Sequence, residues 1–246
     1  MIKVKSDIIP FLNGEKFSNG IDFKIDEKFE DNRRIDLIKN LSKGKKIIHI
    51  GCVDHIPLIK EKVENNTWLH GIITEVAAKV IGVDINKEGI EYIQSEIGVD
   101  NVLCADITSD DISELNGEKW DYMILGEIIE HVDNPILFLN QILTKYKGVV
   151  DQIYITAPNI MVRNRFDYML QNSAELINSD HRFWFTPFTL AKVMTRAGFN
   201  EIQLDFADRV TLNNKELITR KIKSKANKKI EYPFYYFNSV VGIAKF

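Results

Sequence analysis

The sequence predicts one α/β domain with a doubly wound, mostly parallel sheet of seven strands and an antiparallel hairpin at its C-terminal end. Two observations lead to this prediction. Between residues 44 and 159, short apolar runs rich in Ile and Val alternate with helix-like stretches, an order typical of a parallel sheet with helices on both faces. The 246 residues are 45% hydrophobic, which suits a single domain with one sizeable core.

The first predicted strand covers residues 47–50 and ends at Gly51. A glycine at this end lets a ligand approach the backbone, because no Cβ stands in the way. We expect Pro135 to break the helix in which it lies or to start a new one. The later parallel strands are expected at residues 80–83, 102–104, 120–125 and 152–156, and the helices between them at 56–65, 72–79, 88–97 and 128–146.

Residues 1–42 are interpreted as an N-terminal extension of this domain, which spans 1–246. The first 30 residues alternate apolar stretches with Asn-Gly turns and suggest a small hairpin with a loop, either covering the site or simply appended to the fold. Residues 33–41 have helical spacing. The extension could serve as the interface of a homodimer.

The C-terminal part begins with residues 160–186, which we expect to form a lid over the acceptor site. A helix is predicted at 189–197, closed by Gly198. Two strands, at 202–206 and 239–246, would then pair as the antiparallel hairpin at one edge of the sheet.

Composition and charge exclude some classes of function. A net charge of -3 gives no general attraction to nucleic acid or to anionic membranes. The basic stretch at 215–229 is interpreted as a solvated loop. No apolar run is long enough for a membrane span, and no signal peptide is predicted. Two cysteines, Cys52 and Cys104, are too few for a disulfide framework and indicate a reduced, cytoplasmic protein.

Acidic residues close the second and third predicted strands. Asp84 is placed to accept hydrogen bonds from two ribose hydroxyls, and Asp106, with the amide of Ile107, to bind an adenine ring. Each aspartate could instead cap a helix, but two of them in register with a strand that ends in glycine favour a nucleoside site. The single glycine after the first strand and the lack of a phosphate-binding lysine motif disfavour NAD and ATP. They favour S-adenosylmethionine (SAM).

Several motifs in this order resemble the class I SAM-dependent methyltransferases, a Rossmann-like family. They lie at residues 47–52, 80–85, 104–107 and 120–135, with a later similar pattern at His181, Leu190 and 197–199. The resemblance implies SAM as cofactor, the methionine part along the first strand end, the ribose at Asp84 and the adenine at Asp106. The cofactor-binding residues expected on this basis are Gly51, Cys52, Val53, Asp84, Ile85, Asp106, Ile107, Gly126 and Glu127.

The chain also departs from the usual pattern of that family. His49 stands where the family usually has an acidic residue, and Val53 follows where further glycines are common. The stretch between Gly51 and Asp84 is longer than usual. Its extra piece around residues 68–71 resembles methyltransferases encoded with bacterial surface-polysaccharide genes.

Transfer of a methyl group to a hydroxyl requires alignment of the nucleophile and removal of its proton. Histidine suits the second task, and we expect His131 and His181 to be the catalytic residues. His49 is interpreted as a buried structural residue, and His55 as one that could line the site.

A metal site is an alternative interpretation of the same region. If a helix begins near Glu127, then Glu130 and His131 lie on its face with Glu127, and His181 could approach from a later loop. This pattern resembles that of small-RNA 2′-O-methyltransferases and ubiquinone-pathway O-methyltransferases, in which a metal grips the substrate hydroxyls. Because Glu-His-Val is also common here in methyltransferases without a metal, no metal ligand is assigned.

The sequence therefore predicts a SAM-dependent O-methyltransferase whose partner is a small-molecule acceptor. We favour a nucleotide-linked sugar or another precursor of a cell-envelope polysaccharide as that acceptor. The alternatives are a metal-assisted RNA 2′-O-methyltransferase, which the balanced charge disfavours, and a non-catalytic binding protein with the SAM fold. A nicotinamide dehydrogenase is disfavoured by the missing glycines.

Overall fold

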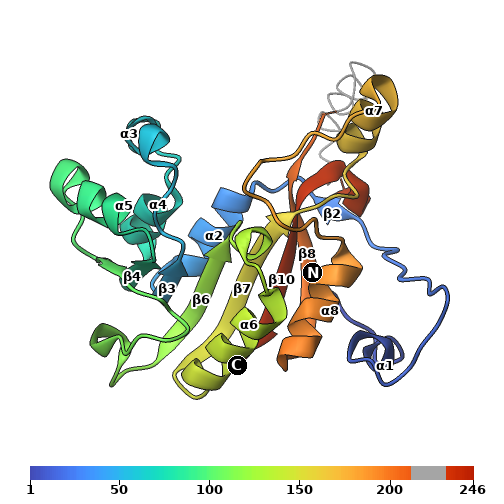
Figure 1. Cartoon of the computed structure of the whole chain (residues 1–246), viewed down its shortest axis with the longest axis horizontal. Coiled ribbons are helices and arrows are strands. Elements are labelled where there is room, and N and C mark those ends of the chain that lie inside the picture. Colours follow the sequence, from blue (N-terminus) through green and yellow to red (C-terminus); the bar gives the residue numbers. More distant parts are fainter. Residues whose placement is uncertain (212–230) are drawn as a thin grey trace.

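The computed structural model describes residues 1–211 and 231–246, and its core is an eight-stranded sheet in the order β1-β8-β10-β7-β6-β3-β4-β5 (Figure 1). Adjacent strands from β7 to β5 run parallel, so the predicted parallel unit is confirmed. Its strands are β3 (Lys46–Ile50), β4 (Lys79–Asp84), β5 (Val102–Cys104), β6 (Trp120–Gly126) and β7 (Val150–Pro158).

The C-terminal strands extend the sheet in the antiparallel sense. β8 (Asn200–Arg209) and β10 (Phe237–Lys245) pair with each other as predicted. β10 also pairs with β7, so it lies inside the sheet and not at its edge. The edge is formed by an eighth strand, β1 (Ile2–Lys3), which pairs with β8.

The expected hairpin within the first 30 residues is wrong. β1 pairs with β8, and β2 (Phe29–Glu30) pairs with β9 (Glu231–Tyr232) in a separate two-stranded sheet. Each of these N-terminal strands has only two residues, too few to form a stable ladder with each other, and both instead complete an edge offered by C-terminal segments. The stretch between them holds α1 (Ile9–Leu12).

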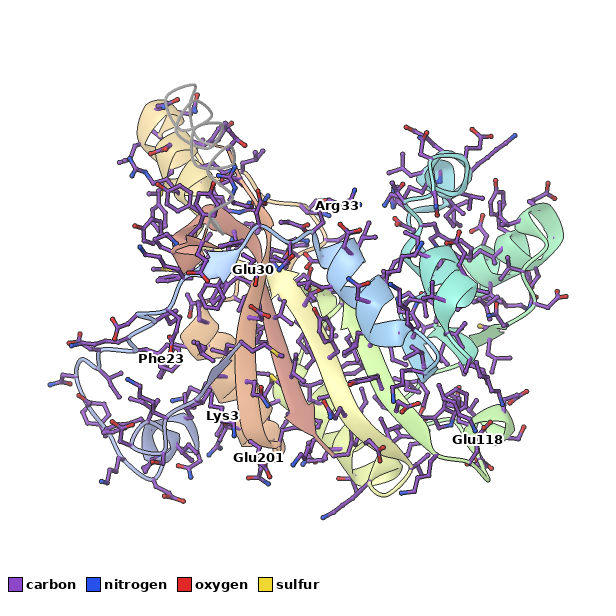
Figure 2. All side chains as sticks on the ribbon, turned by 180° about the vertical axis from the view of Figure 1, so that it is seen from behind. Lys3, Phe23, Glu30, Arg33, Glu118 and Glu201 are labelled. Carbon is purple, nitrogen blue, oxygen red and sulfur yellow. The ribbon has the colours of Figure 1, made fainter. Side chains whose placement is uncertain are left out.

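Alternating strand residues build a core on each face of the sheet. Ile48 belongs to one core cluster with Leu139 of α6 (Pro135–Tyr146) and Leu190 of α8 (Pro187–Ala197). These two helices cover the face of the sheet that Figure 1 shows. Ile47 packs on the opposite face with Ile38, from α2 (Arg34–Ser42), and with residues of α4 (Leu69–Val76). In the view from behind, α2 crosses the sheet, and the labelled Arg33 and Glu118 lie toward opposite ends of the parallel strands (Figure 2).

The remaining helices are α3 (Ile56–Glu64), α5 (Lys87–Tyr92), which continues as a π-helical turn over Ile93–Ile97, and α7 (Arg163–Asn172). α5 with its π-helical turn confirms the helix expected at 88–97. α8 is confirmed as well, and Gly198 closes it with a φ of +108°. The basic stretch at 215–229 lies outside the described residues. No helix within 1–211 or 231–246 combines the length and apolar character needed to cross a membrane.

The helical stretch expected at 128–146 starts anew at Pro135, one of the two outcomes expected for that residue. Residues Ile129–His131 form a 3₁₀ turn, and α6 begins only at Pro135. Proline disfavours helical backbone at the preceding residue, and the Asn134 side chain caps the new helix by accepting a hydrogen bond from the Leu137 amide at 3.1 Å. Glu130 and His131 are therefore presented by a tight turn and not by an α-helix.

Candidate functional site

Two neighbouring cavities open where β3, β4, β5 and β6 end. The smaller, of about 230 Å³, lies between Asp84 and Asp106 and has mainly apolar walls. The larger, of about 360 Å³, is more polar. Gly51, Ile128 and His131 line both cavities. The expected cofactor-binding residues all line one or both of them: Gly51, Asp84, Ile85, Asp106 and Ile107 the smaller, and Gly51, Cys52, Val53, Gly126 and Glu127 the larger.

Gly51 stands where the two cavities meet. Its φ is +69°, in the left-handed region that favours glycine. A Cβ added there would lie 2.0 Å from Cδ1 of Ile128. Both the backbone conformation and the close approach of Ile128 therefore require glycine at the end of β3.

The carboxylate of Asp84 is held by backbone donors at the end of β4. Oδ2 accepts a hydrogen bond from the Val53 amide at 3.0 Å, and Oδ1 accepts one from the Asn86 amide at 2.9 Å. Burial raises the pKa of Asp84, and these backbone donors oppose that rise. A carboxylate offers about four lone-pair sites, so both oxygens can still accept hydrogen bonds from a ligand.

The Asp106 side chain has a structural partner of its own. Oδ1 accepts hydrogen bonds from the Thr108 amide at 2.8 Å and the Thr108 hydroxyl at 2.6 Å. The bond from that hydroxyl is the main cause that lowers the pKa of Asp106. These bonds hold the turn that follows β5 and do not cap a helix, because the next helical segment begins at Ser113. Asp106 also lines the smaller cavity. Nearby, the apolar side chain of Ile85 is 77% exposed, which suits a surface that a ligand covers.

Arg34 also lines the larger cavity, a position that was not predicted from the sequence. It is the first residue of α2, and its Nε lies 3.7 Å from Oδ2 of Asp208 and 3.9 Å from Oε1 of Glu127. One feature of the sequence did point to a role for this residue. A cation in the first turn of a helix is disfavoured by the positive end of the helix dipole, so Arg34 at this position indicates a partner or ligand of opposite charge.

The structure brings Glu130, His131 and His181 together beside these cavities. The His131 and His181 rings meet edge to face, with centroids 4.8 Å apart. His181 Nε2 lies 4.0 Å from Oε1 of Glu130, and potential ligand atoms of the three residues all lie within 4.8 Å of one another. The catalytic residues expected from the sequence are thus neighbours, with a carboxyl group beside them.

Glu130 is fully buried, yet neither of its carboxyl oxygens has a hydrogen-bond partner within the described part of the chain. Burial, together with the nearby Glu127, raises the pKa of Glu130 to about 8. A buried carboxyl group without partners is costly. It must therefore carry a proton or face a cation.

Glu127 does not join this group. Its Oε1 accepts a hydrogen bond from the Ser239 hydroxyl at 3.3 Å and lies near the Arg34 guanidinium. Its φ of +60° turns the chain sharply at the end of β6. Of the four residues considered for a metal site, the structure brings three together and turns the fourth toward Arg34.

A further cavity, of about 570 Å³, lies along α7 and is lined by apolar and aromatic side chains. Arg165 stacks on the Trp184 ring, with Cζ 4.2 Å from the ring centroid, and its Nε is buried without a partner among the described residues. The Trp184 ring is 5.7 Å from that of His181. A row of rings therefore connects this cavity with His131.

A family model described as a methyltransferase domain matches residues 26–204, which is more than half of the chain.

The chain belongs to this methyltransferase family.

Solved structures of other proteins share the fold of this methyltransferase. A SAM-dependent methyltransferase from Thermotoga maritima superimposes with a TM-score of 0.54 at 17% identity, covering 86% of each chain. The small RNA methyltransferase HEN1 superimposes with a TM-score of 0.55 at 18% identity, covering 86% of this chain and 24% of that one. A cyclopropane-fatty-acyl-phospholipid synthase-like protein from Lactobacillus casei superimposes with a TM-score of 0.52 at 10% identity, covering 98% of this chain and 100% of that one. A comparison with curated protein sequences finds no match.

SAM is the cofactor of this methyltransferase, and the residues at the strand ends suit its chemistry. SAM has a nucleoside at one end and a charged amino acid at the other, and the two cavities differ in polarity in the same way. Gly51 lines both cavities, and the Ile128 side chain already occupies the space that a Cβ would need there. The mostly parallel, Rossmann-like sheet predicted from the sequence is thus that of a SAM-dependent enzyme.

Proposed function

We propose that this methyltransferase transfers the methyl group of SAM to a hydroxyl group of a small molecule, with His131 and His181 beside that hydroxyl. The observation that carries the proposal is the position of His131, which lines both cofactor cavities and contacts His181. The imidazole pair thus stands between the cofactor cavities and the aromatic cavity along α7.

The two cavities suggest how SAM lies. Its nucleoside occupies the smaller one, with the ribose hydroxyls on Asp84 and the adenine between Ile85 and Ile107, near Asp106. Its methionine part lies in the larger one along Gly51, where Arg34 offers a cation to the carboxylate. Cys52, Val53, Gly126 and Glu127 form the remaining contacts of that part.

The chemistry follows from this placement. The hydroxyl oxygen of the acceptor attacks the methyl carbon in line with the bond to sulfur, so an O–C bond forms while the C–S bond breaks. The sulfonium leaves as the neutral thioether S-adenosylhomocysteine (SAH). An imidazole of the His131–His181 pair accepts the hydroxyl proton. The enzyme contributes alignment and this proton transfer.

The cavity along α7 supports an acceptor with a stacking ring and an anionic group. Trp184 offers an aromatic face, and the guanidinium of Arg165, which lines the same cavity, offers a cation that suits a phosphate. A nucleotide-linked sugar, such as a cytoplasmic precursor of a cell-envelope polysaccharide, has both features. In this proposal residues 160–186 are the lid of the acceptor site.

A methylation screen tests this proposal. SAM with a labelled methyl group is offered with nucleotide sugars, the matching free nucleotides and simple phenols, and products are identified by mass spectrometry. We expect O-methylated nucleotide sugars, and a fall in turnover larger than the fall in SAH affinity for His131→Ala and His181→Ala. Methylation of phenols alone would exclude the sugar acceptor but not O-methyl transfer. Wild-type turnover in both variants would exclude the histidine roles.

A second candidate function, metal-assisted O-methylation as in RNA 2′-O-methyl transfer, is favoured by the unpartnered carboxyl of Glu130 beside two imidazoles. These donors suit a divalent cation, and Glu130, His131 and His181 would hold it. When bound, the cation would act as a Lewis acid on the acceptor hydroxyls. One protein with a similar fold is a small RNA methyltransferase.

Metal content separates the two candidates. Elemental analysis of the purified protein and of Glu130→Gln shows whether a cation binds there, and EDTA treatment shows whether turnover needs it. A stoichiometric metal that Glu130→Gln loses, together with methylation of a short RNA, would support the second candidate. Turnover that EDTA leaves unchanged would exclude it.

A further inference from the structure

His49 and His70 form a buried pair of imidazoles beside the larger cavity. His49 lies in β3, opposite Gly82 of β4, and His70 lies in α4. Their Nδ1 atoms are 3.2 Å apart, and the ring planes differ by 9°. A Cβ on Gly82 would lie 2.7 Å from Cε1 of His70. The absence of a side chain at Gly82 therefore makes room for this pair.

The neighbours of His70 decide which nitrogens carry hydrogen. Asn101 Nδ2 donates to the Val80 carbonyl at 3.2 Å and to the Thr74 hydroxyl at 3.3 Å, so its Oδ1 faces His70 Nε2, also at 3.2 Å. An amide oxygen only accepts, so His70 Nε2 must donate. A neutral imidazole has one N–H, so His70 Nδ1 accepts from the Nδ1–H of His49. The other nitrogen of His49, Nε2, is left as an acceptor.

This acceptor is available to a ligand. His49 is only 2% exposed, and it is one of the residues that line the larger cavity. No hydrogen bond to Nε2 comes from within residues 1–211 or 231–246, and Nε2 is not among the fully enclosed polar atoms that lack a partner. Burial lowers the pKa of both histidines, so both rings are neutral near pH 7. The larger cavity thus presents a lone pair from His49 and a cation from Arg34.

We propose that His49 Nε2 accepts a hydrogen bond from the α-ammonium group of SAM, with His70 and Asn101 as positioning residues that fix the tautomer of His49. The ammonium is the only strong hydrogen-bond donor in the methionine part, whereas its carboxylate can only accept and suits Arg34. The inference rests on the proposed place of the methionine part in the larger cavity. It gives a function to the histidine that replaces the usual acidic residue on the first strand of the parallel unit.

Calorimetric binding of three ligands tests the inference. SAH has the ammonium, deaminated SAH lacks only that group, and methylthioadenosine lacks the whole amino-acid part. For His49→Leu we expect roughly tenfold or more loss of SAH affinity, as for a hydrogen bond to a charged group, and unchanged affinity for the other two ligands. Asn101→Leu, which frees the tautomer of His70, should weaken SAH in the same selective way but less. Asn116→Leu, at a distant turn, is the matched control.

An equal loss of affinity for SAH and deaminated SAH, or no loss for either, would overturn the role of His49. If His49→Leu does not fold, Asn101→Leu provides the same test: its affinity for SAH should fall more than its affinity for deaminated SAH. Unchanged affinity of this variant for methylthioadenosine shows that the nucleoside site is intact. Failure of the cofactor placement itself would look different, because Asp84→Asn would then leave the affinity for all three ligands unchanged.

Discussion

At the scale of single residues, Gly51 is the position where the site tolerates least change. Gly51→Ala would place a methyl group against Ile128 and hold alanine at a φ of +69°. We expect a destabilisation of about 1–3 kcal/mol from backbone strain alone and a loss of SAH binding, measured by chemical unfolding and calorimetry. Gly148→Ala is a matched control, because its φ is +80° but no described atom lies within 4 Å of the added Cβ. It should lose stability and keep SAH affinity, and equal binding losses would contradict the steric argument.

Asp84 offers a second test at this scale. Asp84→Asn keeps the shape of the side chain but removes the charge that suits two ribose hydroxyls. We expect SAH affinity to fall roughly 10- to 100-fold, as for hydrogen bonds to a charged group, in isothermal titration. Asp121→Asn is the control, because its carboxylate accepts a hydrogen bond from the Lys46 amide at the opposite end of β3. Unchanged affinity for Asp84→Asn would remove Asp84 from the site.

The residues that the sequence located are those whose position follows from the strand ends. Gly51, Asp84 and Asp106 end neighbouring parallel strands, so they converge whatever the loops do. Arg34 and the ligand-facing side of His49 could not be located in this way. Arg34 reaches the cavity only because α2 packs across the sheet, and the availability of His49 Nε2 depends on hydrogen bonds to residues 21 and 52 positions further along.

At the scale of elements, the turn over Ile129–His131 positions the proposed catalytic group, and α6 follows it directly. Periodicity predicted one helix here, because the apolar spacing continues through the break. Pro135 was the available signal, and Asn134 completes it as the cap. The sequence could show that a break was possible, but not that residues 129–131 form a 3₁₀ turn, nor that Glu127, at a φ of +60°, directs its carboxylate toward Arg34 and Ser239.

The cap of α6 can be tested directly. Asn134→Ala removes the acceptor for the Leu137 amide, and we expect a loss of about 1 kcal/mol in the free energy of unfolding. Asn134→Asp keeps the acceptor and adds a favourable charge at the helix N-terminus, so it should be at least as stable as the wild type. Both are measured by urea unfolding, and an equal loss in the two variants would show that the cap does not stabilise α6.

At the scale of the whole molecule, the parallel half was predictable because alternating strands and helices with right-handed crossovers leave few arrangements. The antiparallel half of the sheet was only partly predictable. The antiparallel pairing of β8 with β10 was expected, but the insertion of β10 between β8 and β7 depends on contacts far apart in the chain. β1 and β2 have two residues each, too few for a pattern to be recognised.

The buried histidine pair also makes the stability of the whole molecule depend on pH. Burial lowers the pKa of His70 from 6.5 to about 4 and lowers that of His49 as well. Between pH 6.5 and about 4, the unfolded chain therefore binds more protons than the folded chain. The stabilisation is therefore complete above about pH 6.5 and is lost as the pH falls toward 4. For His70 alone the loss is about 3 kcal/mol.

Carboxyl groups titrate in part of the same range, so the pair must be isolated by comparison. We expect the free energy of unfolding of wild type to fall more steeply from pH 6.5 to 4 than that of a variant with both His49→Leu and His70→Leu. The contributions of titratable groups that both proteins contain cancel when one curve is subtracted from the other. The difference then reports the protons that the two imidazoles take up on unfolding. Parallel curves would mean that the imidazoles titrate alike in the folded and unfolded chains, and that the neutral tautomer on which the His49 inference depends is not enforced by burial.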